Sequence, residues 1–300
     1  MNSYKIVNDD RMKLLKKLKN NSVQLIITSP PYNIGKSYEV KIPLKDYIKE
    51  QKKTLKECVR VLKETGSICW QVGNFIKKGD TEIIPLDILV YKICKELNLK
   101  LRNRIVWHYE HGLHANKRFS GRYETIMWFT KNNNYYFNLD EVGEKYKFYV
   151  NGKAEIDQPK VRVPQKYPGK VAYQGKNKGK YSGNKNGKNP SDVWIFPNVK
   201  SMHKEKTIHP CQFPIELAER LVLSMSKKND LVVDPYMGAG TTLVAALKNN
   251  RKAAGSEIKK TYINIVKKRI SLLKKGKLPF RKMNTPIKML GPNSKLYRRD

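Results

Sequence analysis

Short runs of apolar residues alternate with stretches in which apolar positions recur every three or four residues, over most of this 300-residue chain. The continuous runs predict buried strands, and the recurring positions predict amphipathic helices. Alternating strands and helices indicate an α/β fold with a doubly wound, mostly parallel sheet. The expected strands cover 23–28, 67–72, 101–109, 123–130, 231–233 and 252–257, and the expected helices 9–19, 44–64 (ended by Gly66), 84–97, 215–224, 241–249 and 261–274.

This regular pattern breaks between about residues 133 and 205. From Gln158 to Ser191 the chain has nine Lys or Arg and no acidic residue, with many Gly, Asn and Tyr but no periodicity. Such a composition predicts a loop or an irregular insertion. The sequence therefore divides into two halves of one α/β domain at 1–132 and 206–274, separated by an inserted basic region at 133–205 and followed by a basic tail at 275–300.

The charge balance narrows the range of partners. Lys and Arg number 61 against 26 Asp and Glu, a formal net charge of +35, which favours a polyanion such as nucleic acid. The alternative is that the lysines only solvate helix surfaces. The four cysteines form no CxxC pair, which argues against a zinc site or a disulfide framework. No apolar run is long enough to cross a membrane and no apolar leader begins the sequence, so we expect a cytoplasmic protein with no membrane partner.

One turn carries the first candidate chemistry. Ser29-Pro30-Pro31-Tyr32 directly follows the apolar run at 23–28, and consecutive prolines can neither continue a sheet ladder nor enter a helix interior. The chain must therefore leave the strand in a stiff, extended turn, at the sheet edge where open α/β proteins bind ligands. A hydroxyl, a carbonyl and an aromatic face there suit a planar base whose exocyclic amine needs hydrogen-bond acceptors. The alternative for Tyr32 is a core aromatic packed under the prolines.

A glycine turn carries the second candidate chemistry. Gly238 and Gly240 lie between a strand and a helix, where they allow a tight turn and close approach to a ligand, and Glu257 stands where an acid would bind ribose hydroxyls. The lysine of a phosphate loop is absent, and Leu243 replaces the third small residue of a dinucleotide fingerprint. S-adenosylmethionine, which has no phosphates, fits better, with Asp234 facing its cationic methionine end. A turn that merely links strand to helix is the alternative.

Together the two turns resemble motifs of the DNA amino-methyltransferases, which methylate exocyclic base nitrogens. Thr28–Asn33 is similar to their catalytic turn, Asp234–Gly240 to their S-adenosylmethionine loop, and His209–Pro214 to the element that precedes this loop. Asn8-Asp9-Asp10 resembles their Asn-Gly-Asp near the amino terminus, although Asp9 replaces the glycine. The catalytic motif comes first and the cofactor motif last, which is the order of the family's β group. The resemblance implies the Rossmann-like methyltransferase fold.

The resemblance also implies which residues act. Ser29, Pro30, Pro31 and Tyr32 are expected to be catalytic: the serine hydroxyl and the Pro30 carbonyl would accept the amine hydrogens, and the tyrosine would stack on the base. The residues themselves indicate no acceptor for the proton that the methylated amine must lose. Asn33 has the alternative of capping its own turn. The residues expected to bind S-adenosyl-L-methionine are Asp10, Asn33, His209, Pro210, Phe213, Asp234, Pro235, Tyr236, Gly238, Gly240, Thr241 and Glu257.

Family members with Ser-Pro-Pro-Tyr mostly methylate cytosine, and those with Asp-Pro-Pro-Tyr mostly methylate adenine. We therefore expect a sequence-specific methyltransferase that acts on the N4 amine of a cytosine flipped out of double-stranded DNA, with adenine N6 as the alternative. The resemblance further implies the modification enzyme of a restriction-modification system, which would pair it with a restriction endonuclease for the same site. Methylation of a protein glutamine or an RNA base, nonenzymatic nucleic-acid binding and an NAD oxidoreductase remain as other classes.

Basic residues are expected to bind DNA in two places. Lys117, Arg118 and Arg122 would meet the DNA backbone; the histidine-rich stretch at 108–114 just before them lies in a strand-to-loop region, which argues against a metal site. In the inserted region lysines would neutralise phosphates and aromatic residues would read bases, and the resemblance places target recognition there. A disordered, solvated loop is the alternative. The residues are Lys166, Lys170, Tyr173, Lys176, Lys178, Lys180, Lys185 and Lys188.

Overall fold

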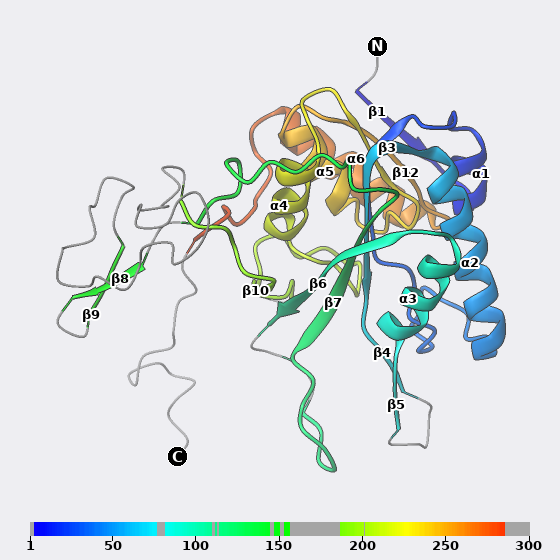
Figure 1. Cartoon of the computed structure of the whole chain (residues 1–300), viewed down its shortest axis with the longest axis horizontal. Helices are drawn as coiled ribbons and strands as arrows, with labels where there is room; N and C mark the ends of the chain where they lie inside the picture. Colours follow the sequence, from blue (N-terminus) through cyan, green and yellow to red (C-terminus); the bar gives the residue numbers. More distant parts are fainter. Residues whose placement is uncertain are drawn as a thin grey trace. The chain divides into compact units, whose positions relative to one another are not determined.

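The computed structural model describes residues 3–76, 82–109, 112, 114–144, 147–150, 153–156, 187–200 and 202–285. Two compact units divide the chain: one combines 1–136 with 192–300, and the other is Phe137–Ser191. The larger unit is built on a sheet of eight strands with helices on both faces (Figure 1). This arrangement confirms the α/β class expected from the alternating pattern.

The central sheet is mostly parallel. Its strand order is β1-β12-β11-β2-β3-β7-β6-β10, and β7 runs antiparallel to both of its neighbours while the other pairings are parallel. Strands β2 and β11 are direct neighbours, with Leu25 opposite Val232 and Ile26 opposite Val233. The strands are β1 (Tyr4–Val7), β2 (Val23–Thr28), β3 (Leu62–Val72), β6 (Lys100–His108), β7 (Tyr123–Thr130), β10 (Val193–Ile195), β11 (Leu231–Asp234) and β12 (Lys252–Ser256).

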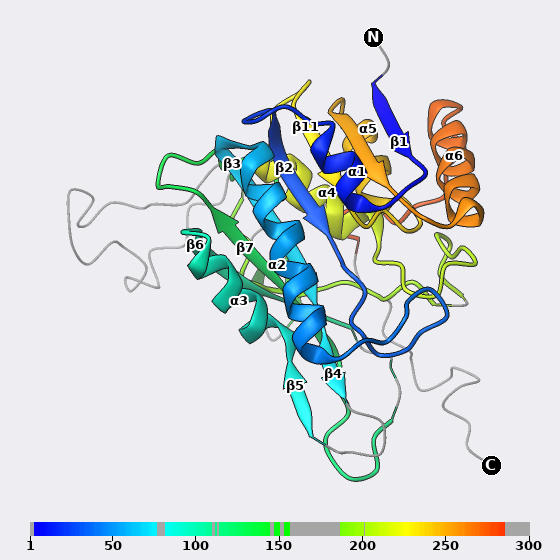
Figure 2. The same cartoon turned by 90° about the vertical axis from the view of Figure 1, so that its right-hand side faces the viewer.

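Three helices cover each face of the sheet. Figure 2 shows α1 (Arg11–Lys16), α2 (Leu44–Val61) and α3 (Leu86–Glu96) in front of the strands. The other face is covered by α4 (Ile215–Met225), α5 (Thr241–Lys248) and α6 (Lys260–Lys274).

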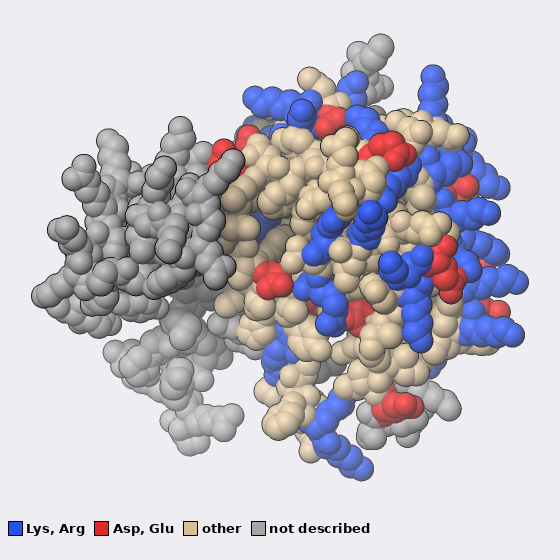
Figure 3. Space-filling model, viewed as in Figure 1, with Lys and Arg blue, Asp and Glu red and all other residues tan. Residues whose placement is uncertain are grey.

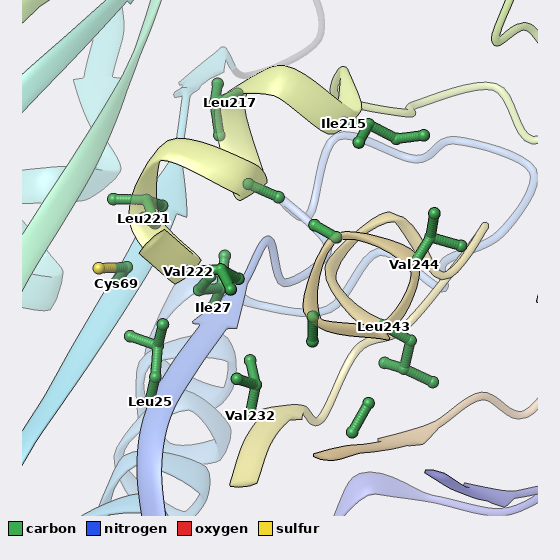
Figure 4. Packing of buried hydrophobic residues seen from close by; sticks show 14 of the residues in the cluster. Leu25, Ile27, Cys69, Ile215, Leu217, Leu221, Val222, Val232, Leu243 and Val244 are labelled. Atoms are coloured by element: carbon green, nitrogen blue, oxygen red, sulfur yellow. The ribbon is translucent and has the colours of Figure 1, made fainter. Parts of the chain in front are cut away.

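Side chains of β2 supply both cores, because successive residues of a strand point to opposite faces. Leu25 and Ile27 pack with α4 and α5, as Figure 4 shows, while Ile26 packs with the helices of the other face. All six residues of β2 are buried, which explains why its sequence is a continuous apolar run rather than an alternating one. The strand is therefore held from both sides at the point where its carboxyl end releases the Ser29 turn.

Several predicted boundaries are wrong. Helix α2 ends at Val61 and β3 begins at Leu62, so Gly66 lies inside a strand rather than ending a helix. A Cβ on Gly66 would lie 2.9 Å from the Gln24 carbonyl oxygen, so the glycine lets β3 pass close to β2 where their register shifts. The sequence pattern also missed β1 and β10, and the short pair β4 (Asn74–Ile76) and β5 (Ile83–Pro85).

The smaller unit is narrower than the insertion expected at 133–205. Residues from 192 onward belong to the larger unit, because β10 pairs with β6 in the central sheet. The smaller unit is also not wholly irregular: β8 (Lys147–Val150) and β9 (Lys153–Ile156) form an antiparallel hairpin. Glu144 and Lys188 exchange two backbone hydrogen bonds, which joins the beginning of this unit to its end.

Within the described residues, no helix combines the length and apolar character needed to cross a membrane. The same residues contain no group of three or more His, Cys, Asp or Glu side chains that could hold a metal ion. Glu110 and His111 lie outside the described residues. The cysteines are all unpaired, with Cys58, Cys69 and Cys94 buried and Cys211 exposed.

Gly240 provides a test of how the glycine turn is packed. It adopts the left-handed conformation (φ of 73°) at the start of α5, and a Cβ there would lie 2.6 Å from Val266 Cγ1. Gly240→Ala should therefore suffer both backbone strain and overpacking, lowering the free energy of unfolding by about 2–4 kcal/mol in urea denaturation.

Gly276→Ala is the matched control. Gly276 has a similar φ of 66°, but a Cβ at this position would have no atom within 4 Å, so the substitution adds strain without crowding. We expect it to cost about 1–2 kcal/mol. Equal losses for the two variants would show that contact with Val266 contributes nothing.

Candidate active site

The Ser29 turn and the glycine turn open into one cavity at the carboxyl ends of the central strands. The cavity has a volume of about 780 Å³ and lies wholly within the larger unit. The proximity of two loops about 200 residues apart in sequence follows from the pairing of β2 with β11. Lining residues predicted to be catalytic or to bind cofactor are Asp10, Ser29, Pro30, Pro31, Tyr32, Asn33, His209, Pro210, Phe213, Pro235, Tyr236, Gly238, Thr241 and Glu257.

Hydrogen bonds fix the Ser29 turn. The Ser29 and Tyr32 hydroxyl oxygens lie 3.0 Å apart, and the Tyr32 hydroxyl donates to Glu124 Oε2 at 2.7 Å. Gln71 donates its side-chain amide to the same carboxylate oxygen at 2.7 Å. A Cβ on Gly73 would lie 3.0 Å from the Tyr32 ring, so the glycine leaves room for this aromatic side chain. The phenol is therefore anchored by its hydroxyl beside the cavity.

Sequence analysis missed Glu124, which lines the cavity next to Tyr32. It lies on β7, opposite Trp107 of β6, and its role depends on a pairing between strands that sequence alone does not reveal. Desolvation by burial raises the pKa of Glu124, while the hydrogen bonds from Tyr32 and Gln71 oppose the rise. The available signal was an acidic residue directly before the apolar run of 125–130, which is unusual for a strand that is about to be buried.

Asp234 differs from its expected place. Its carboxylate accepts hydrogen bonds from Thr28 Oγ1 at 2.6 Å and from the Tyr236 backbone N–H at 3.1 Å. Only 1% of Asp234 is exposed, and burial raises its pKa to about 6. Among the described residues, Asp234 and Gly240 do not line the cavity. Asp234 therefore ties the end of β2 to the end of β11, and this geometry gives no support to a direct contact with the methionine end of a cofactor.

Glu257 lies directly after β12, at the expected edge of the sheet. Its two carboxylate oxygens accept from the backbone N–H groups of Gly238 at 3.0 Å and Lys259 at 2.8 Å. Burial raises the pKa of Glu257, and these backbone donors favour its ionised form. The carboxylate is thereby held in a fixed position on the cavity wall beside the glycine turn.

His209 packs tightly against the glycine turn. Its ring stacks on Tyr38 at 5.7 Å and meets Tyr262 edge-on at 4.5 Å between centroids. Burial lowers the pKa of His209 to about 4, so the ring is neutral near pH 7. A Cβ on Gly238 would lie 2.9 Å from His209 Nε2, and Gly238 has a φ of 50°. Glycine is therefore required at this position for two independent reasons.

Two further expected residues hold loops in place. The Phe213 carbonyl accepts from Thr241 Oγ1 at 3.3 Å, which joins the 209–213 segment to the start of α5. The Asn33 side chain donates to the Ile42 carbonyl at 2.7 Å and accepts from the Ile42 N–H at 2.8 Å. Of the two alternatives for Asn33, this geometry supports the structural one.

Asp10 caps a helix beside the cavity. Its Oδ1 accepts from the Met12 N–H at 2.8 Å and its Oδ2 pairs with Arg11 at 2.6 Å. Farther along α2, Tyr47 Oη and Gln51 Oε1 are buried, line the same cavity and have no hydrogen-bond partner among the described residues. These two polar atoms, which sequence analysis did not identify, are available to a bound molecule.

The basic residues expected to bind DNA fall into three groups. Arg118 is exposed and lines the cavity, Lys117 is exposed beside it, and Arg122 donates to the Gly121 carbonyl. Lys188 lies in the smaller unit, 3.9 Å from the Glu144 carboxylate. Those outside the described residues are Lys166, Lys170, Tyr173, Lys176, Lys178, Lys180 and Lys185.

Positive charge is not confined to the inserted region. Figure 3 shows Lys and Arg side chains gathered over the part of the larger unit that carries α1 and α2. Helix α2 alone has five lysines, some paired with acidic neighbours, such as Lys53 with Glu50. Part of the net charge therefore solvates helices.

Comparison with known sequences identifies the family. A sequence profile described as "DNA methylase" matches residues 23–268. The type II methyltransferase M.BglII of Bacillus subtilis is 47% identical over 261 residues, which cover 87% of this chain and 67% of that protein. The DNA adenine methyltransferase YhdJ of Escherichia coli (strain K12) is 34% identical over 275 residues, covering 89% of this chain and 82% of that protein.

Comparison with solved structures shows the same fold. The PvuII cytosine-N4-specific DNA methyltransferase has a TM-score of 0.64 at 18% identity, covering 92% of this chain and 94% of that one. TTHA0409 of Thermus thermophilus, a DNA modification methylase solved with S-adenosyl-L-methionine, has a TM-score of 0.61 at 23% identity over 90% of this chain and 94% of that one. The chain therefore belongs to the DNA methylase family of N4 and N6 amino-methyltransferases, and it is a DNA methyltransferase whose methyl donor is S-adenosyl-L-methionine.

Proposed function

We propose that this methyltransferase acts on the N4 amine of a cytosine flipped out of double-stranded DNA, as the modification enzyme of a restriction-modification system. One observation carries the choice of base: a neutral hydroxyl, Ser29, stands before the two prolines at the cavity wall. The type II methyltransferase M.BglII, at 47% identity, supports the restriction-modification role.

The Ser29 turn suits an exocyclic amine. The lone pair of such an amine is conjugated with the ring, so the nitrogen is a weak nucleophile until its hydrogens are bound by acceptors that turn the lone pair out of conjugation. The Ser29 hydroxyl and the Pro30 carbonyl would supply these two acceptors in a rigid arrangement. The Tyr32 ring would stack on the base and recover part of the few kcal/mol that flipping costs.

The far side of the cavity suits S-adenosylmethionine. The fixed Glu257 carboxylate would accept hydrogen bonds from ribose hydroxyls, and the unpartnered Tyr47 and Gln51 atoms fit a ligand with both donors and acceptors. The neutral His209 ring and the Gly238 backbone would lie against the ligand. When bound, the cofactor supplies an activated methyl group on a cationic sulfur, while this chain's residues bind and orient it.

Adenine N6 is the second candidate. It is favoured by the relative named a DNA adenine methyltransferase, which matches this chain at 34% identity. Adenine also presents an exocyclic amine, so the same turn could orient it.

Target recognition is proposed for the region around Phe137–Ser191. It stands between the catalytic half and the cofactor half of the sequence, and it carries the run of lysines and tyrosines without acidic residues. Lysines would position the DNA backbone, and the aromatic and amide side chains would contact base edges.

Mass spectrometry of nucleosides tests the proposed base directly. DNA from a host that expresses the chain, or DNA treated with purified protein and S-adenosylmethionine, should yield N4-methylcytosine. N6-methyladenine in its place would establish the second candidate. Absence of both from DNA that contains all short sequence motifs would contradict the proposed function.

Tyr32→Ala should lower turnover far more than cofactor affinity. Loss of base stacking removes about 1–3 kcal/mol of stabilisation, which is on the order of 10- to 100-fold in rate. Steady-state methylation and calorimetric binding of S-adenosylmethionine measure the two effects. Tyr91→Ala, which removes a partly exposed tyrosine from α3, is the control and should keep the wild-type rate. A wild-type rate for Tyr32→Ala would remove the stacking role.

Deletion of residues 165–190 should abolish sequence choice while the protein still binds S-adenosylmethionine. Sequencing that detects modified bases would then find methylation lost or spread over unrelated sites. Methylation that stays confined to the wild-type site would place sequence recognition elsewhere in the chain.

A further inference from the structure

Four polar groups form a chain that leads from the cavity into the sheet. Ser29 Oγ lies 3.0 Å from Tyr32 Oη, which donates to Glu124 Oε2 at 2.7 Å; Gln71 Nε2 donates to the same oxygen at 2.7 Å. The four residues come from the loop after β2, from β3 and from β7, and all line the cavity. The chain therefore connects the proposed reaction centre to a carboxylate.

Counting hydrogens gives this chain a direction. An ionised carboxylate only accepts hydrogen bonds, and a phenol has a single hydrogen to donate. Because Tyr32 donates its hydrogen to Glu124, its oxygen accepts the hydrogen of Ser29. The remaining lone pairs of the Ser29 oxygen are then free to accept a hydrogen from the substrate amine.

We propose that Glu124 is the positioning residue that sets this direction and, resting on the proposed function, that it is the final acceptor of the proton that the methylated amine loses. Ser29 and Tyr32 act as the relay between the two.

The proton balance of the relay closes without a further reactant. The amine nitrogen forms its new bond to carbon as the bond from that carbon to the sulfonium sulfur breaks, which leaves the nitrogen with a positive charge and one proton too many. That proton moves to Ser29 Oγ, the Ser29 hydrogen moves to Tyr32 Oη, and the Tyr32 hydrogen moves to Glu124 Oε2. Glu124 ends as a neutral acid and releases its proton to solvent after the product leaves.

The surroundings of Glu124 suit an acceptor that is easily protonated. Burial raises its pKa, while the Tyr32 and Gln71 hydrogen bonds lower it in part. Tyr109 of the β6 end, with Arg122 acting on it, Tyr38 of the loop after β2 and Cys211 of the 209–213 segment also feel the Glu124 charge or stand beside it.

Protonation of Glu124 would reverse the relay. A neutral acid can donate to Tyr32, which then donates to Ser29, and the Ser29 hydrogen would point at the amine hydrogens. Because the pKa is raised, the ionised form is lost at a higher pH than for an ordinary glutamate. Methylation should therefore fall as the pH decreases through this raised pKa and reach its plateau above it.

The experiment compares Glu124→Gln with wild type in single-turnover methylation of duplex DNA across pH. We expect a loss of about 10²-fold at the plateau, the scale of one positioned proton-transfer group, and disappearance of the acidic decline. A purely structural role would lower the rate but keep the pH profile. Glu219→Gln neutralises another buried glutamate, one that pairs with Lys248 on the far side of the sheet, and it should keep both the rate and the profile.

Tyr32→Phe keeps the ring and removes only the relay hydroxyl, so the test survives if Glu124→Gln fails to fold. It should reproduce the altered pH profile, and the double variant should be no slower than the slower single variant. A wild-type rate and acidic decline in Glu124→Gln or Tyr32→Phe, or additive losses in the double variant, would overturn the relay while the proposed function stands. A wild-type protein that leaves DNA amines unmethylated would overturn both.

Discussion

The site depends on the pairing of two central parallel strands, β2 and β11. Because both strands end at the same edge, the loop that carries Ser29 and the loop that carries Gly238 must open into the same space. A buried hydrogen bond from Thr28 to Asp234 joins the last residues of the two strands at 2.6 Å. Its low-polarity surroundings make it stronger than the same bond in water and make loss of either partner costly. Separation of these strand ends would leave two unconnected half-sites.

Local chemistry then gives each loop its shape. Consecutive prolines after Thr28 prevent further strand pairing, and glycines at 238 and 240 adopt backbone conformations that other residues avoid. His209 and Val266 fill the space that side chains at these glycines would occupy. Burial is the common electrostatic theme: it raises the pKa values of Asp234, Glu124 and Glu257 and lowers that of His209. Reduced contact with water keeps His209 neutral and makes the hydrogen-bonded carboxylates sensitive to their partners.

The sequence allowed the prediction of features that depend on short stretches of chain. The apolar run before Ser29 and the glycine turn after β11 specify a strand end and a loop by themselves, so their shared cavity could be expected once the sheet was assumed. The role of Asp234 could not, because its partner Thr28 is 206 residues away in sequence. Glu124 was missed for the same reason: its function lies in contacts with Tyr32 and Gln71 across neighbouring strands. Gly66 was misjudged because glycine ends helices and also allows strands to approach closely.

The order of the strands has a consequence for how the protein is made. β1, the first strand, pairs with β12, nearly the last, and β2 waits for β11 in the same way. During synthesis at the ribosome the first half of the sheet therefore emerges with its pairing edges unsatisfied until almost the whole chain has been translated. Such distant pairings also slow folding. Methylation competence is thus acquired only after translation is nearly complete, so truncated nascent chains have no assembled site with which to modify DNA.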